Sequence, residues 1–306
     1  MDQALISHML ETIAGISGKT GGAFNLRLDS KGVERYSTEN IKIIPKTDRP
    51  GIDILVRPGT KGESVHIPVI LTESGLNDLV YNDFIIGEGA DVTIIAGCGI
   101  HNEGHAKSEH DGIHAFKIGK NAHVRYVEKH YGEGSGTGER VLNPTTLVDL
   151  AEGACCEMEM VQIGGVSSTL RKTDATLGKN AKLLITERLM THDAQTATSD
   201  VVIHLNGEDS SAQVISRSVA KDTSNQVFHP IAQGNARCHA HIQCDTILMD
   251  EAHVRSIPEI EANHSEAAII HEAAIGRINN EQMLKLETLG LDESEAEKII
   301  IDAFLD

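Results

Sequence analysis

The chain has 306 residues, with 27 Lys and Arg against 45 Asp and Glu, so its formal charge is −18. It has no Trp, and 4 Tyr plus 5 Phe give only 9 aromatic residues, about 3%. A negative surface repels phosphate backbones and so few rings leave little for bases to stack on, which excludes a nucleic-acid partner. The core must therefore be built from Val, Ile, Leu and Ala, which suits layers of short strands.

The first segment shows no targeting pattern. Residues 1–17 mix polar and apolar side chains and lack a cationic stretch followed by an apolar one, so we expect no signal peptide. No run approaches the roughly 20 apolar residues that span a bilayer. We expect a cytoplasmic protein without membrane contact, whose cysteines are reduced. These are Cys98, Cys155, Cys156, Cys238 and Cys244.

Residues 3–16 carry apolar side chains at helical spacing, which predicts one short amphipathic helix. Residues 17–80 are rich in turn residues, and the segments 51–57 and 64–71 read as short strands. We expect this region, 1–83, to lead into the main domain.

A short phrase then recurs: one or two turn residues, a small Ala, and alternating apolar and polar residues. In its first six copies the Ala stands at positions 90, 122, 154, 181, 212 and 236. The alternation predicts half-buried strands, and the Gly or Asn before most of these Ala residues tolerates the positive φ of a tight turn. One copy is too short to bury its own apolar face, so the copies must stack. We predict a mainly β protein, a right-handed parallel β-helix over 84–275; a jelly roll or β-sandwich is the alternative.

The last residues, 276–306, predict a helical hairpin. Asn279 or Asn280 caps a helix that ends near Gly290, and Asp292 with Glu295 forms a variant capping box for a second helix. The apolar face of the hairpin either covers the open end of the solenoid or binds a partner.

Histidines gather in two clusters. The first consists of His101, His105, His110 and His114, with Cys98 just before them. Imidazole and thiolate are metal ligands, but no fixed ligand spacing is present, so a transition-metal site and a solvated loop both remain open.

The second cluster lies around Cys244. Neighbouring strands of a solenoid lie about 4.8 Å apart, so a thiolate, an imidazole and a carboxylate from successive coils can converge. The alternative is structural, because Cys244 shares its alternation phase with Cys238 and Ile242 and so reads as a core residue. The cluster comprises Cys238, His239, His241, Cys244, Asp245, His253, His264, His271 and Glu272.

Several motifs in order resemble one known family. Residues 243–249, QCDTILM, resemble the QCDSxLM phrase of the SufB/SufD family, scaffold components of the SUF iron-sulfur cluster assembly system. SIPEI at 256–260 and HEAAIGRI at 271–278 follow in the family's order, and Gly97-Cys98 with His114-Ala115 is similar to its GCTAP and LHAA pair. The resemblance runs from about residue 20 to the C-terminus, and the adjacent His271 and Glu272 make the chain SufB-like.

The resemblance implies a non-enzymatic scaffold that builds a transient iron-sulfur cluster. The family's functional Cys, His and Glu fall on Cys244, His271 and Glu272. Its sulfur-accepting cysteine falls on Cys98, which should then be partly exposed, with a thiol pKa lowered by His101 or Lys107.

The resemblance also implies partners. ATP hydrolysis is expected from a SufC-like ABC ATPase that docks on the C-terminal helices, and a sulfur donor protein is a further expected partner. A chain much shorter than the usual SufB that carries all three site residues favours a homodimer through the last β-helix strands. There His271 of one protomer would face Cys244 and Glu272 of its partner. The expected docking residues are Leu284, Leu289, Ile300 and Phe304.

Three other functions fit parts of the sequence. The first is a β-helix enzyme acting on acidic polysaccharide, although such enzymes are usually secreted and use aromatic sugar platforms. The second is a cysteine-dependent hydrolase with Cys244, His271 and Glu272 as a triad, which requires a thiol of low pKa. The third is a purely structural solenoid, in which replacing Cys244 changes stability alone.

Overall fold

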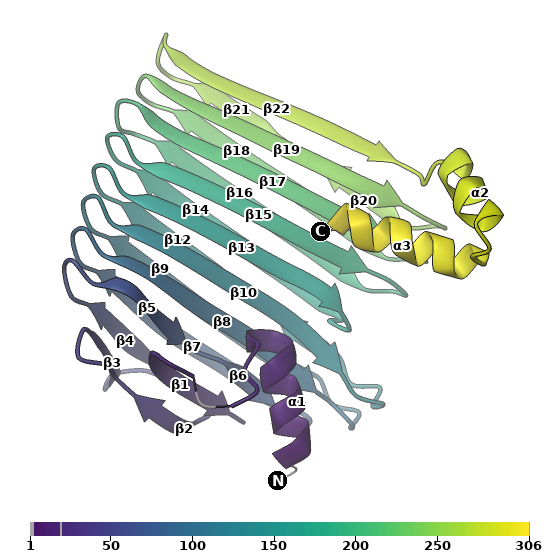
Figure 1. Cartoon of the computed structure of the whole chain (residues 1–306), viewed down its shortest axis with the longest axis horizontal. Coiled ribbons are helices and arrows are strands. Elements are labelled where there is room, and N and C mark those ends of the chain that lie inside the picture. Colours follow the sequence, from purple (N-terminus) through teal and green to yellow (C-terminus); the bar gives the residue numbers. More distant parts are fainter. Residues whose placement is uncertain (1–2, 19, 306) are drawn as a thin grey trace.

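The computed structural model describes residues 3–18 and 20–305. Strands dominate it, and they form a parallel β-solenoid of about eight turns, with one N-terminal and two C-terminal helices (Figure 1). The predicted parallel β-helix is thus confirmed, and the jelly roll and sandwich are wrong. No helix in the described part of the chain is both long and apolar enough to cross a membrane.

The solenoid has two sheets that face each other across the core. Sheet A consists of β1 (Ala23–Leu28), β2 (Lys31–Tyr36), β5 (Lys61–His66), β6 (Val69–Leu71), β8 (Asp91–His101), β10 (His123–Glu133), β13 (Cys155–Gly164), β15 (Lys182–Thr191), β17 (Ser210–Ala220), β19 (Cys238–Leu248) and β22 (Ala267–Gly276). Sheet B consists of β3 (Ile41–Pro45), β4 (Gly51–Val56), β7 (Asn77–Ile86), β9 (Ser108–Ile118), β11 (Arg140–Leu142), β12 (Thr145–Leu150), β14 (Ser168–Leu177), β16 (Thr196–Leu205), β18 (Asn225–Gly234), β20 (His253–Ser256) and β21 (Glu259–Ala262).

The repeated phrase marks the turn at which each coil enters sheet A. Gly89 and Asn121 have φ values of 64° and 53°, and the Ala residues that follow them are buried. The strands then pair in register, so that Val124 lies between Val92 and Cys156, and all three side chains are buried. Because the inward residues of each strand pair in register with the inward residues of the next, apolar side chains stack in layers along the solenoid.

The N-terminal helix α1 (Gln3–Ala14) packs on the outer face of β8 and β10. Met9 and Ile13 are fully buried there. The helix comes so close that a Cβ on Gly97 would lie 2.4 Å from the Ile13 carbonyl oxygen, and one on Gly99 2.4 Å from Met9 Cε. Glycine at position 97 is therefore needed for the helix to dock, because a backbone atom occupies the space, whereas at position 99 the flexible end of Met9 can shift.

The C-terminal helices α2 (Asn280–Thr288) and α3 (Glu293–Leu305) form the predicted hairpin. Asn279 caps α2 by accepting from the Glu281 backbone N–H. In the capping box of α3, the Glu295 backbone N–H donates to Asp292 Oδ1 at 2.8 Å, and the Asp292 N–H donates to Glu295 Oε2 at 3.0 Å. The predicted caps are confirmed.

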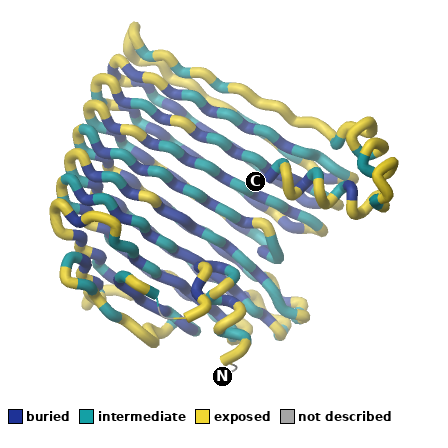
Figure 2. The backbone as a smooth tube through the Cα atoms, viewed as in Figure 1, coloured by how far each residue is buried: buried dark blue, intermediate teal, exposed yellow. Residues whose placement is uncertain are grey.

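The hairpin does not cover the end of the solenoid. Ile301 and Leu305 of α3 pack against Val219 of β17, so the hairpin lies beside sheet A (Figure 1). The last strands, β20, β21 and β22, are mostly exposed (Figure 2). The C-terminal end of the solenoid is therefore open, with the backbone of β22 unpaired on one side among the described residues. The predicted domain boundaries, at residue 83 before the β-helix and at residue 275 after it, stay a prediction.

Candidate functional site

Cys244 lies on the inner face of β19, in the last complete coil. It is 2% exposed, and its register neighbours are Ser216 on β17 and Ala273 on β22. Burial raises the pKa of the Cys244 thiol, against the smaller effect of nearby Ser256 and Thr246 hydroxyls. The parity argument for a buried cysteine is thus confirmed. Burial of the Cys244 thiol also disfavours the cysteine hydrolase, which needs a thiol that ionises easily.

His271 lies on β22 beside Cys244 in space. It pairs with Ile242, which is buried, so its side chain shares the inner face with Cys244; along β22 it lies two residues before Ala273, the register partner of Cys244. Its Nε2 atom is buried and has no hydrogen-bond partner among the described residues. Desolvation, with a smaller effect of His241, lowers the pKa of His271. A neutral imidazole without a partner is a ready metal ligand.

Glu272 points the other way. Its side chain is 64% exposed on the outer face of sheet A, where Oε2 lies 3.3 Å from His241 Nε2. Adjacent residues of a strand face opposite sides, so His271 and Glu272 of one chain cannot both meet Cys244. Within one protomer, Cys244 and His271 therefore share the inner face of sheet A, whereas Glu272 lies on the outer face, so Cys244 and Glu272 of one chain do not face the same side.

The rest of the second histidine cluster divides in the same way. Cys238 is buried inside, whereas His239, His253 and His264 are exposed. Asp245 is on the outer side of β19, where its Oδ2 accepts from Gln243 at 2.6 Å. These groups do not form one site.

Cys98 is buried on the inner face of β8, with 4% exposure, in register with His130. Burial raises the pKa of its thiol well above the ordinary value, and the negative charges of Glu128 and Asp78 add to the effect. The expectation of a partly exposed thiol with a lowered pKa is wrong. The predicted activating cations are engaged elsewhere. His101 lies 3.0 Å from a Glu133 oxygen, and the Lys107 ammonium contacts Glu109 at 2.5 Å.

The first histidine cluster does not form a joint site. His110 Nδ1 lies 3.0 Å from Asp78, and His114 Nδ1 lies 2.8 Å from the Tyr126 hydroxyl, both inside the solenoid. His105 is exposed and meets Thr137. The four imidazoles therefore have separate partners, and the transition-metal site is not supported.

A chain of buried polar side chains fills the interior between the two cysteines. Tyr126 donates to Glu128 at 2.9 Å, and Arg171 from sheet B reaches across to Glu128. The Arg171 Nε also lies 3.4 Å from Glu187, whose other oxygen accepts from Ser216 at 3.1 Å. Ser216 is the register partner of Cys244. The polar interior thus extends from the surroundings of Cys98 to Cys244.

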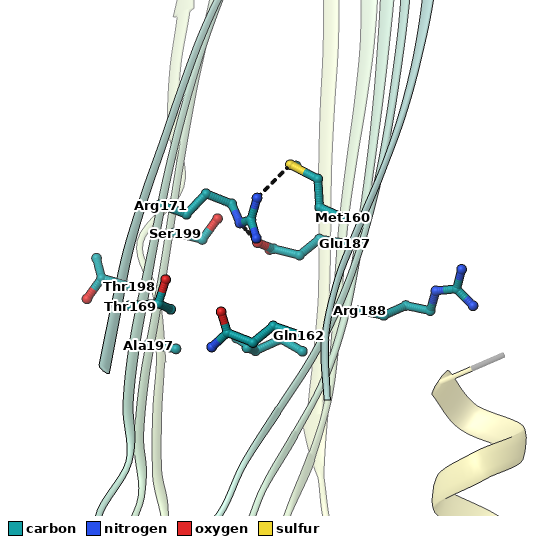
Figure 3. A pocket seen from close by; sticks show the side chains of 10 residues that line it. Met160, Gln162, Thr169, Arg171, Glu187, Arg188, Ala197, Thr198 and Ser199 are labelled. Carbon is teal, nitrogen blue, oxygen red and sulfur yellow. Dashed lines mark hydrogen bonds and ion pairs between the residues drawn. The ribbon is translucent and has the colours of Figure 1, made fainter. Parts of the chain in front are cut away.

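The centre of this chain is Arg171. Figure 3 shows its guanidinium pointing between the sheets toward Met160 and Glu187, while Arg188 points outward. The cavity beside it measures only about 10 Å³. Although burial disfavours the charged carboxylate, Arg171 lowers the pKa of Glu128 to about 2. An ionised pair is thus held in a closely packed interior.

The alternation of β10 also indicates the buried polar residues Glu128 and His130. Glu128 and His130 share their alternation phase with Val124 and Tyr126, so the pattern that predicts the core also predicts two titratable groups inside it. A charged residue at a core position marks either a buried pair or a site.

The C-terminal hairpin exposes apolar residues. Leu284 and Leu289 are 61% and 75% exposed, while Ile300 and Phe304 line a groove of about 450 Å³ next to Ile247. Ile300 and Phe304 are half-buried, and Leu284 and Leu289 lie outside the lining of the groove; exposed apolar side chains of this size are typical of interaction surfaces.

Comparison with known proteins gives consistent matches. Residues 74–304, which include Cys98, Cys244 and His271, match the family described as SUF system FeS cluster assembly, SufBD core domain. An iron-sulfur cluster assembly SufBD family protein of Methanocaldococcus jannaschii is 30% identical over 255 residues, 82% of this chain and 79% of that protein. One of Archaeoglobus fulgidus is 28% identical over 280 residues, 90% of this chain and 73% of that protein. One of Staphylococcus saprophyticus is 24% identical over 227 residues, 72% of this chain and 48% of that protein.

Proposed function

Because this chain belongs to the SufBD family and so has a role in iron-sulfur cluster assembly, we propose that it is the scaffold on which a nascent cluster is built. The scaffold is SufB-like and does not catalyse a reaction itself. The observation that carries the proposal is the placement of Cys244 and the unpartnered His271 imidazole on one face at the open end of the solenoid. All five cysteines are free, and we propose that the scaffold works in the reducing cytoplasm.

The ligand set suits a cluster that is passed on. Iron binds thiolate strongly, and Cys244 supplies one thiolate once iron displaces its proton. His271 adds a neutral nitrogen ligand. Mixed ligation by few thiolates holds a cluster less firmly than four cysteines do, so transfer to a recipient is easier.

The open end supports a homodimer. An unpaired strand edge offers its backbone N–H and C=O groups to another chain, and β22 is such an edge. Pairing of two copies there brings two Cys244 and two His271 residues to one seam. Glu272 faces outward, so it cannot join Cys244 of its own chain as a cluster ligand. It can bind the cluster only if it reaches the Cys244 side of the partner protomer.

The hairpin is the proposed dock of a SufC-like ABC ATPase, which supplies the ATP hydrolysis. Leu284, Leu289, Ile300 and Phe304 offer the apolar contacts.

Cys98 is the proposed acceptor of sulfur from a donor protein. The buried polar side chains between Cys98 and Cys244 support this role, because they place both thiols in one polar interior. Cys98 packs inside the solenoid with residues such as Val69, Leu71 and Leu142, so this part of the interior must open before a donor reaches the thiol.

Anaerobic reconstitution with iron and sulfide tests the scaffold. We expect visible sulfide-to-iron absorbance in the wild type and little in Cys244→Ala. The matched control is Cys238→Ala, because Cys238 is also a buried, inward-facing cysteine of β19. Equal uptake of iron and sulfide by wild type and Cys244→Ala would refute the assignment.

A further inference from the structure

A second group of metal-ligating side chains lies on the outer face of sheet A. Asp91, His123 and Cys155 are in register on β8, β10 and β13, and Glu157 follows two residues after Cys155 on the same face. A ring nitrogen of His123, the Cys155 sulfur and a Glu157 oxygen lie within 4.8 Å of one another. Nothing in the cluster assembly role uses these residues.

We propose that His123, Cys155 and Glu157 bind one divalent transition-metal ion of the zinc type, with solvent as the fourth ligand. Thiolate, imidazole and carboxylate are the donors that such ions take in tetrahedral sites. Metal–ligand bonds of about 2.0–2.3 Å place tetrahedral ligand atoms about 3.5 Å apart. His123 Nε2 and Glu157 Oε1 are already 3.2 Å apart. Small side-chain rotations bring the Cys155 sulfur, which lies within 4.8 Å of both, to the same spacing.

Asp91 completes the arrangement. Its Oδ1 lies 3.1 Å from His123 Nδ1. In metal sites the histidine ligand commonly donates its second ring N–H to a carboxylate, which fixes the tautomer and turns the other nitrogen toward the metal. Asp91 is therefore a positioning residue, and His123 Nε2 is the ligand atom.

The neighbouring charges leave the three ligands available. Arg125 is paired with Glu159 at 3.2 Å, although its register partner is Glu157. Lys182 follows Cys155 in register on β15 and offsets part of the negative charge of the site.

The site opens on a groove of about 350 Å³, so the ion can exchange with solvent. The groove is lined by Cys155, Glu157, Lys182, Ser211, His239 and His241, among others. His123 and Glu157 are 41% and 45% exposed.

The site is separate from Cys244. Cys155 faces outward, whereas its neighbour Cys156 is buried inside. Cys244 pairs in register with Ser216, Ser216 with Glu187, and Glu187 with Met160, so β13 is three strands away from β19. On β13, Met160 lies a further five residues along the strand from Cys155. The two sites can therefore be tested independently.

Anaerobic titration of the whole chain with cobalt(II), which reports thiolate ligation by a charge-transfer band, tests the proposal. Cys244→Ala serves as the host, so that the proposed cluster site contributes no thiolate. We expect one equivalent of cobalt bound, with a band that zinc removes. Adding Cys155→Ser should abolish the band, and adding Asp91→Asn should keep it but weaken binding about 10-fold or more.

Asp174→Asn is the matched control, because Asp174 is an exposed carboxylate that lies 3.5 Å from a histidine, His204, on the other sheet, away from the proposed site. It should leave both band and affinity unchanged. A folded host without a cobalt band, or a band that persists in Cys155→Ser, would overturn the metal site and leave the cluster proposal untouched.

Discussion

Single buried residues decide how the interior of the solenoid behaves. Glu128 and Arg171 come from opposite sheets and are 1% and 3% exposed. The two side chains form an ion pair that compensates for the hydration each loses on burial. Glu187 gives Arg171 a second carboxylate at 3.4 Å. Removing one partner of such a pair leaves an uncompensated charge, which costs more than the pair contributes. The interior is therefore more sensitive to changes at Arg171 than to changes at an apolar neighbour of similar size.

Arg171→Met should lower the free energy of unfolding by about 3–5 kcal/mol, because the Glu128 carboxylate stays buried without its cation. Urea titration measures the loss. Adding Glu128→Gln should recover part of it. Arg188→Met on the outer face should cost less, about 1 kcal/mol, since the Arg188–Glu159 pair keeps partial contact with solvent. Equal losses for Arg171→Met and Arg188→Met would contradict the buried pair.

The buried histidines make the fold sensitive to acid. Burial lowers the pKa of His114 and of His130 to about 4, from 6.5. The unfolded chain then binds more protons than the folded one, so stability is full above pH 6.5 and falls as the pH approaches 4. His130→Gln should flatten the loss of unfolding free energy over this window. His105→Gln, at an exposed position, should not, and an unchanged slope in His130→Gln would argue against a buried neutral imidazole.

At the scale of elements, local patterns predicted most of the fold. Alternation placed the strands, and positive φ at Asn121 and the Asp292–Glu295 box were readable because each depends on residues near in sequence. The pairing of Glu128 with Arg171 was not readable, because it joins residues 43 apart and depends on the length of every coil between them. The outward direction of Glu272 also agrees with alternation, although the resemblance assigned this residue to the same site as Cys244 and His271.

The C-terminal hairpin uses only one face of α3 to pack on the solenoid. Ala296, Ile301 and Leu305 are the buried residues of α3, whereas Ile299 is 46% exposed. Neighbouring Met190 and Met249 complete the cluster around Val219. One face of α3 is thus used by the solenoid, and another is left for a partner.

Leu284→Asp combined with Leu289→Asp should prevent copurification of the ABC-type ATPase from the source cell, because both side chains are exposed and lose their apolar contacts. The fold should be retained, as neither residue is buried. The matched control is Val33→Asp, an apolar residue of β2 that is 57% exposed and lies in the N-terminal part. Undiminished recovery of the ATPase with the double variant would place the dock elsewhere.

The whole molecule has two unlike ends. Antiparallel strands β2 and β3 finish the sheets at the N-terminal end, whereas β22 and β21 leave the other end open. Ile260, Ile270 and Ile275 are 44–49% exposed at that end. With a formal charge of −18, two copies repel each other unless a specific apolar and backbone contact opposes the repulsion. The open end is the surface that offers one.

Native mass spectrometry of the anaerobically reconstituted protein tests the central claim most directly, because it reports chain number and bound iron and sulfide together. We predict that iron and sulfide occur on the species with two chains, and that the Cys244→Ala protein forms the same species without them. Iron and sulfide bound to a single chain, or retained in full by Cys244→Ala, would contradict a scaffold that builds its cluster at the seam between two copies.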